Sequence, residues 1–136
     1  MKGDLIKVHA DRSNGWMGDD PSAFGGESMW AIDLGNNHAV INNTPFFTYG
    51  LSLYDRVRTD NDGEIERVIE PSGLYNIRAI VTDENDFESL HEAVKPYTVA
   101  VEGGFGALLV MTVAKTLRQT VERLLRDGDY SWENGN

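Results

Sequence analysis

The sequence predicts an α+β fold in which a mostly β N-terminal half, residues 1–71, packs on a ferredoxin-like C-terminal half, residues 72–136, as one compact unit. Its 136 residues suffice for one domain or for two small subdomains that share a core. With 40% hydrophobic and 25% charged residues, the composition is typical of a globular protein. Apolar residues follow the two-residue period of strands before residue 72, and strands then alternate with amphipathic helices.

The first half has short strand patterns that are separated by turn residues. Gly35-Asn36-Asn37 predicts a hairpin turn, and Asp60-Asn61-Asp62-Gly63 predicts a second turn. A long loop with aromatic residues is expected over 12–26. The segments with strand-like patterns are 5–8, 28–34, 38–41, 46–58 and 65–69. This half is therefore predicted to be all β.

The second half has two helical patterns among its strands. Asn85 and Glu88 have the spacing of a capping box at the start of the first helix, and Pro96 ends that helix. Lys115–Arg126 has the apolar spacing of a second helix, which Gly128 stops. Strand patterns cover 74–81, 97–101, 107–113 and 130–132, with a hairpin turn at 103–106. The order strand, helix, two strands, helix, strand predicts a ferredoxin-like arrangement.

The chain is strongly acidic, with 12 Lys and Arg against 22 Asp and Glu and a formal net charge of -10. This charge disfavours nucleic acid and anionic membranes as partners and favours a protein with a basic surface. The absence of cysteine excludes disulfides and is typical of a reducing compartment. The N-terminus lacks the apolar core of a signal peptide, and the longest apolar run, 107–113, is too short to span a bilayer. We therefore expect a cytoplasmic protein.

Residue spacing indicates no catalytic or metal site, and we expect neither a metal nor another cofactor. His9, His38 and His91 are too far apart in sequence for a helical zinc site. Ser72 is the most pointed candidate nucleophile, but it lacks the Gly-x-Ser-x-Gly pattern, and a turn serine is the simpler interpretation. Nothing in the sequence requires enzymatic activity, and nothing in it excludes such activity.

Aromatic residues are concentrated between Trp16 and Tyr75. They form either the core of the β half or an aromatic surface that binds a ligand or a partner. Arg78 either binds a carboxylate or phosphate or forms a salt bridge with a neighbouring acid. The candidate binding residues are Trp30, Phe46, Phe47, Tyr49, Tyr54, Ser72 and Arg78.

Five acidic residues, without one Lys or Arg, lie between residues 83 and 92. A solvated helix face explains them, because acids near a helix N-terminus interact favourably with the helix dipole. A face that docks a basic protein explains them too, because complementary charge steers association. The candidate docking residues are Asp83, Glu84, Asp86, Glu88 and Glu92.

Several short segments occur in an order that is found in one bacterial family. They are Gly15-Trp16, Glu27-Ser28-Met29-Trp30-Ala31, Asn43-Thr44-Pro45-Phe46-Phe47, Gly50-Leu51-Ser52-Leu53-Tyr54-Asp55, Ser72-Gly73, Arg78 and a tail with Trp132. The chain resembles the domain of unknown function 4265 family. Leu74-Tyr75-Asn76 departs from the small polar residues that follow Ser-Gly in that family. The resemblance implies no catalytic residue, and it implies a common constellation of Trp30, Pro45, Phe46, Phe47, Asp55, Ser72, Gly73 and Arg78.

Two function hypotheses follow from these observations. Small size, strong acidity and the lack of catalytic signatures favour a protein-binding inhibitor, most concretely an immunity protein that neutralises a bacterial toxin with a basic surface. The alternative is a small-molecule binding or sensing domain, with a ligand held between the two halves near Trp30, Phe47, Tyr49 and Arg78. A hydrolase that uses Ser72 ranks below both.

Overall fold

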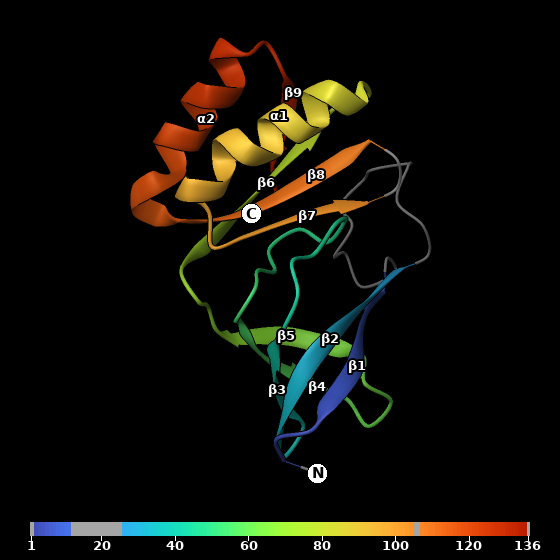
Figure 1. Ribbon diagram of the computed structural model, residues 1–136. Coiled ribbons are helices and arrows are strands. Elements are labelled where there is room, and N and C mark those ends of the chain that lie inside the picture. The colour runs from blue at the N-terminus through green and yellow to red at the C-terminus, as the bar shows by residue number, and fades with distance from the viewer. Residues whose placement is uncertain (1, 12–25, 105–106, 136) are drawn as a thin grey trace. The chain divides into compact units, whose positions relative to one another are not determined.

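The computed structural model describes residues 2–11, 26–104 and 107–135, and within them the protein is α+β, with two antiparallel sheets and two α-helices (Figure 1). The chain divides into two compact units, Met1–Ser72 and Gly73–Gly135. Most of the loop expected over 12–26, together with Phe105 and Gly106 of the expected turn, lies outside the described residues. The family segment Gly15-Trp16 lies outside them as well.

The first unit is a five-stranded antiparallel sheet in which each strand pairs with the next one in sequence, in the order β1-β2-β3-β4-β5. The strands are β1 (Leu5–Asp11), β2 (Gly26–Gly35), β3 (His38–Ile41), β4 (Arg56–Thr59) and β5 (Ile65–Glu70). His9 also forms a parallel bridge with Glu64, and its N–H donates to the carbonyl of Gly63 at 2.9 Å. The sheet therefore curls until β1 lies beside the residues that begin β5.

One face of this sheet buries the core of the first unit. Asn36 and Asn37 have φ values of 54 and 63, as a type I′ turn requires, and they close the predicted hairpin between β2 and β3. Alternate residues, such as Lys7 and Trp30, lie on the opposite face, which we call the outer face. The buried core residues are Val8, Ala10, Met29, Ala31, Ala39, Ile41, Leu51, Val57 and Ile65.

The second unit is a four-stranded antiparallel sheet of order β7-β8-β6-β9 with both α-helices on one face (Figure 1). Its elements are β6 (Leu74–Ile80), α1 (Glu84–Val94), β7 (Ala100–Gly104), β8 (Leu108–Ala114), α2 (Arg118–Asp127) and β9 (Ser131–Asn134). The core lies between the sheet and the helices, where Ile77 and Met111 meet Leu90, Val94 and Leu125. No helix among the described residues has the length and apolar character needed to cross a membrane.

Several predictions of local structure are wrong. The cap of α1 is Asp83, whose carboxylate accepts the N–H groups of Asn85 and Asp86, so the expected capping box of Asn85 and Glu88 does not form. A 3₁₀ turn over Lys95–Tyr97 delays the strand expected at 97, and β7 begins at Ala100. The segment 46–55 is not a strand, because side-chain carboxylates rather than a neighbouring strand satisfy part of its backbone.

Candidate functional site

The segment between β3 and β4 is held in place by the carboxylate of Glu27 on β2. Glu27 Oε2 accepts the N–H of Phe46 at 2.6 Å, and Oε1 accepts the N–H groups of Phe47 and Thr48 at 2.9 and 3.0 Å. The hydroxyl of Thr48 also donates to Oε1 at 2.8 Å. Because hydrogen bonds to a charged acceptor are stronger than neutral ones, Glu27 determines the backbone conformation of 46–48.

A second carboxylate, Asp55, joins the end of this segment to the turn after β5. Asp55 is only 4% exposed. Its Oδ2 accepts the N–H of Ser52 at 2.9 Å, and its Oδ1 accepts the N–H of Ser72 at 2.7 Å. These bonds compensate for the burial of the charge. Ser72, the candidate nucleophile and binding residue, lies between β5 and β6, and its backbone N–H donates to Asp55.

The two exposed candidate aromatics are Trp30 and Tyr54, which are 43% and 52% exposed. The ammonium of Lys7 lies 4.1 Å from the centre of the Trp30 ring, on the outer face of the sheet. Phe47 packs against the core of the first unit, whereas Phe46 and Tyr49 are half-buried. The aromatic candidates therefore comprise Phe47, which packs against the core, two further half-buried residues, Phe46 and Tyr49, and the exposed Trp30 and Tyr54.

Tyr54 has an unusual backbone conformation for a tyrosine, with φ at 70. Its N–H donates to the carbonyl of Ile41, and the N–H of Ile41 donates to the carbonyl of Asp55, both at 2.9 Å. Tyr54 and Asp55 thus oppose the single residue Ile41, which is the pattern of a G1 β-bulge whose first position normally holds glycine. A bulky side chain at positive φ stores local backbone strain.

Arg78 lies in the second unit, on the face of the sheet away from the helices, and is 4% exposed. Its register neighbours are Val110 on β8 and Glu133 on β9. A Cβ added at Gly135 would overlap the guanidinium, so the Gly135 backbone packs directly against Arg78. The aromatic candidates, in contrast, lie in the first unit.

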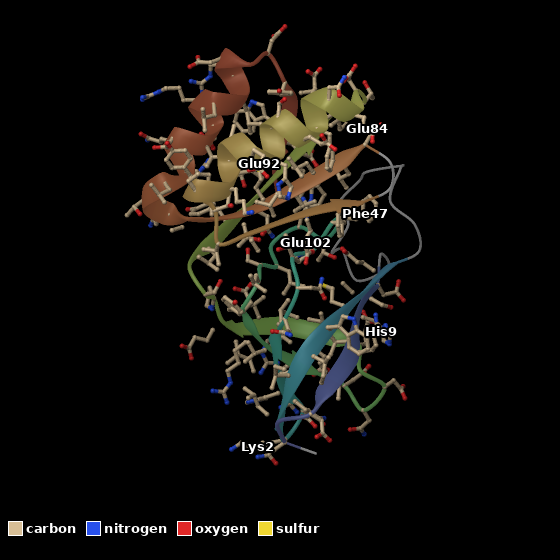
Figure 2. All side chains as sticks on the ribbon, in the orientation of Figure 1. Lys2, His9, Phe47, Glu84, Glu92 and Glu102 are labelled. Atoms are coloured by element: carbon tan, nitrogen blue, oxygen red, sulfur yellow. The ribbon has the colours of Figure 1, made fainter. Side chains whose placement is uncertain are left out.

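The five candidate docking acids are all on α1 or its cap, and all are exposed. Asp83 caps the helix, while Glu84 and Asp86 lie in its first turn, where acids interact favourably with the helix dipole. Glu88 and Glu92 continue the acidic surface toward the other end of α1. Figure 2 labels Glu84 and Glu92, which lie toward the two ends of the helix. The acidic surface therefore extends along the whole helix.

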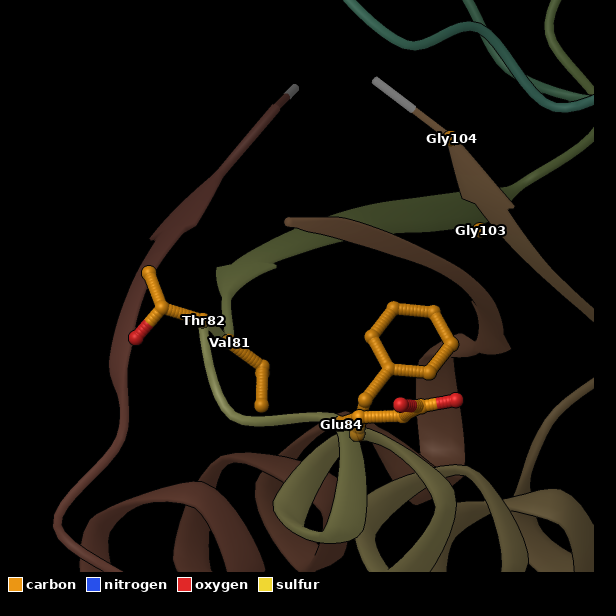
Figure 3. Close-up of a pocket in the computed structure, with 6 residues that line it drawn as sticks. Val81, Thr82, Glu84, Gly103 and Gly104 are labelled. Carbon is orange, nitrogen blue, oxygen red and sulfur yellow. The ribbon is translucent and has the colours of Figure 1, made fainter. Parts of the chain in front are cut away.

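Two open hollows adjoin this acidic surface, and Phe87 lines both of them. The first has a volume of about 470 Å³ and lies between Glu84 at the start of α1 and Gly103 and Gly104 on β7 (Figure 3). The second, of about 350 Å³, is lined by Phe87, Glu88, His91 and Glu92. We call these two hollows together the acidic groove.

Gly103 makes the position of Phe87 possible. A Cβ added at Gly103 would overlap Cζ of the Phe87 ring, so the ring lies directly against the backbone of β7. Phe87 is half-buried and also contacts the core of the second unit. The acidic groove thus combines a fixed aromatic ring with exposed carboxylates, an arrangement suited to a cationic side chain.

One serine hydroxyl contacts a histidine ring in the described part of the chain. His9 Nδ1 and Ser28 Oγ are 2.7 Å apart across the β1–β2 pair, and Glu64 lines the same shallow hollow. The Glu64 carboxylate accepts the backbone N–H of Asp11 at 2.8 Å. In the described ranges no three His, Asp or Glu side chains are grouped as a metal site requires. The His9–Ser28 contact joins β1 and β2.

The sequence did not predict that Glu27 holds the segment after β3, nor that Phe87 and Gly103 form the acidic groove. The helical spacing of Phe87 with Leu90 and Val94 indicated a core residue, whereas its ring also lines two hollows. Gly103 was expected only as part of a turn. No local signal marks Glu27, because its partners lie 19 to 21 positions further along the chain.

These features define a two-unit α+β protein whose C-terminal unit carries an acidic groove around an aromatic ring. The chain belongs to the family described as a domain of unknown function (DUF4265), whose family model matches residues 27–133, as its motifs predicted. Its fold is similar to that of a hypothetical protein from Neisseria gonorrhoeae of known crystal structure, with a TM-score of 0.71 and 18% sequence identity. That match covers 99% of this chain and 96% of the other. No curated protein is significantly similar to the chain.

Proposed function

We propose that this chain is a small protein-binding inhibitor, most concretely an immunity protein that neutralises a cognate bacterial toxin. The acidic groove is the contact surface in this proposal, and the partner presents a basic surface. The supporting observation is that Phe87 lies between two hollows whose exposed rims carry Glu84, Glu88 and Glu92. Aromatic residues at the centre of an interface and charges at its rim are the usual arrangement of protein contacts.

The groove fits a lysine or arginine side chain of the partner. The cation lies over the Phe87 ring, where the ring quadrupole attracts it, and the carboxylates of Glu84 and Glu88 complete its coordination. Because the rim acids are exposed, their main effect is to accelerate association rather than to slow dissociation. Added salt therefore slows binding by screening these charges.

Charge-neutralised variants test the proposal. The double variant Glu88→Gln and Glu92→Gln removes two rim charges, and the double variant Glu70→Gln and Asp127→Asn removes two exposed charges elsewhere. Tagged proteins capture partners from native cells at low salt, and mass spectrometry identifies bound proteins and small molecules. We expect one stoichiometric protein that the wild type and the control retain and that the groove variant loses.

The captured protein then distinguishes an inhibitor from a simple binder. Its association rate should fall at least tenfold between low and high salt, because rim charges steer the encounter. Co-expression of the chain should relieve the growth defect that the partner causes. The proposal is contradicted if the groove variant retains the partner as well as the wild type does. It is also contradicted if the association rate does not change with salt concentration. A bound metabolite without a protein favours the alternative, a small-molecule binding or sensing domain.

Two finer structural and cellular assignments belong to the same proposal. We propose that Gly73–Gly135 is a ferredoxin-like unit, which the element order from β6 to β9 and the strand order β7-β8-β6-β9 support. We also propose a cytoplasmic location, where an inhibitor meets a toxin that acts inside the cell. Localisation of a fluorescent fusion in the native cells tests the second assignment.

A further inference from the structure

A row of residues on the outer face of the first unit crosses all five strands in register. Leu5 on β1 pairs with Ile32 on β2, Ile32 with Val40 on β3, and Val40 with Arg56 on β4. Arg56 in turn pairs with Glu70 on β5. The row therefore places three apolar side chains next to one guanidinium.

The apolar part of this row is partly exposed to solvent. Leu5 is 51% exposed, and Ile32 and Val40 are half-buried although they lie opposite the core face. Trp30, the next outward residue on β2, widens the apolar strip beside Lys7. Exposed apolar residues gathered on one sheet face mark a binding surface more often than isolated ones do.

Arg56 is the unusual member of the row. Its Nη2 donates to Nδ1 of His38 at 3.0 Å, which requires Nδ1 to be unprotonated. Its Nε is buried and has no hydrogen-bond partner among the described residues. Within the same described residues, Arg58 on the same strand pairs with Glu66 at 3.2 Å, whereas Arg56 and its register neighbour Glu70 form no ion pair within 4.0 Å.

Among the described residues the Arg56 guanidinium has no acidic partner, which is notable in a chain with 22 Asp and Glu residues. A buried donor that lacks an acceptor costs free energy, because it has lost its water without gaining a protein hydrogen bond. The planar guanidinium matches two oxygens of a carboxylate or phosphate. A carboxylate or phosphate oxygen would supply the acceptor that Arg56 Nε lacks among the described residues.

We propose that Arg56, with His38 beside it, binds the oxyanion head of an amphipathic ligand whose apolar body lies along Val40, Ile32 and Leu5. The head is a carboxylate or a phosphate, since both present the paired oxygens that a guanidinium binds. This site is on the first unit and is independent of the acidic groove, so either proposal can fail without the other.

The length of the ligand's hydrocarbon chain distinguishes this site from a simple ion contact. Octanoate and acetate carry the same head, but octanoate has six more methylenes to lay on the apolar row. Each fully buried methylene tightens binding about fourfold, so burial of two gives about fifteenfold. We expect octanoate to bind at least tenfold more tightly than acetate, with saturable shifts of the Arg56 Nε–H signal in ¹H–¹⁵N NMR spectra of the full chain.

Three variants make the assignment specific. Arg56→Gln should weaken octanoate binding at least tenfold, and Arg56→Lys should weaken it by a smaller factor because it keeps the charge but loses the paired donors. Arg67→Gln removes an exposed cation from β5 and should leave binding unchanged. Octyl phosphate in place of octanoate shows which head the site prefers, and tighter binding of either one supports the proposal.

Other outcomes overturn it. Equal affinity for acetate and octanoate shows that the apolar row takes no part. A chloride titration that shifts the Arg56 signal as strongly as octanoate does shows an adventitious ion only. Unchanged octanoate binding in Arg56→Gln, with the fold intact by circular dichroism, places the ligand elsewhere. Absence of any saturable shift up to the solubility limit of octanoate also refutes the site.

Discussion

The carboxylate of Glu27 and the hydroxyl of Thr48 are joined by a 2.8 Å hydrogen bond although 21 positions separate them in the chain. Together with the N–H groups of Phe46, Phe47 and Thr48, this bond gives the segment after β3 its shape. Glu27 and Phe46-Phe47 are among the segments that carry the family resemblance. Part of the family pattern therefore encodes this local structure.

Replacement of Glu27 by Gln should lower the free energy of unfolding by about 2 to 3 kcal/mol, because hydrogen bonds to a charged group contribute more than neutral ones. The amide also brings a donor toward groups that are themselves donors. Urea unfolding of the purified protein measures the change. Glu70→Gln, an exposed control, should stay within about 0.5 kcal/mol of the wild type. Equal midpoints for the two variants would show that the Glu27 bonds carry no stability.

The strain at Tyr54 predicts a reversal of the usual order of glycine and alanine. In a regular strand, glycine is less stable than alanine by roughly 0.5 to 1 kcal/mol. At positive φ the alanine Cβ is penalised instead, so Tyr54→Gly should be more stable than Tyr54→Ala by about 1 kcal/mol. Trp30, an exposed residue within β2, is the control, and there the alanine variant should be the more stable one. Urea unfolding measures both pairs of variants. If the alanine variant is the more stable one at both sites, the Tyr54 backbone is not strained.

The contact between Gly103 and Phe87 predicts a strong coupling. Gly103→Ala alone should destabilise the protein by about 1 to 3 kcal/mol, because the added Cβ displaces a packed ring. In a Phe87→Ala background the same change should cost almost nothing, because the ring is gone. A double-mutant cycle in thermal unfolding measures this coupling. Additive effects would mean that the ring does not rest on Gly103.

The cap of α1 provides a direct comparison of two neighbouring residues. Asp83→Ala should cost about 1 kcal/mol, because two N–H groups at the helix start lose their acceptor. Asn85→Ala should change stability by less than about 0.5 kcal/mol, because Asn85 contributes its backbone N–H rather than a side-chain cap. Thermal unfolding of both variants measures the two changes in stability. A larger loss of stability for Asn85→Ala than for Asp83→Ala would support the capping box that the sequence spacing predicted.

Local patterns predicted much of the secondary structure. The hairpin at Asn36-Asn37, the strand at 74–80 and the two helices followed from turn chemistry and from apolar spacing, both of which depend on residues within one or two turns of each other. The error at the start of α1 occurred because two neighbouring residues could each cap the helix. Asp83 and Asn85 are both good caps, and the sequence spacing favoured the wrong one because Glu88 completes a capping box only with Asn85.

The sequence by itself determined the α+β class, the family and the acidic character of α1, because composition, period and ordered motifs are properties of the chain. Only the tertiary structure decided that Glu27 holds residues 46–48, that Phe87 rests on Gly103 and that Arg56 stands at the end of an apolar row. Each of these contacts joins segments far apart in sequence through strand register or packing. Register and packing depend on how all the elements assemble, and no local pattern contains that information.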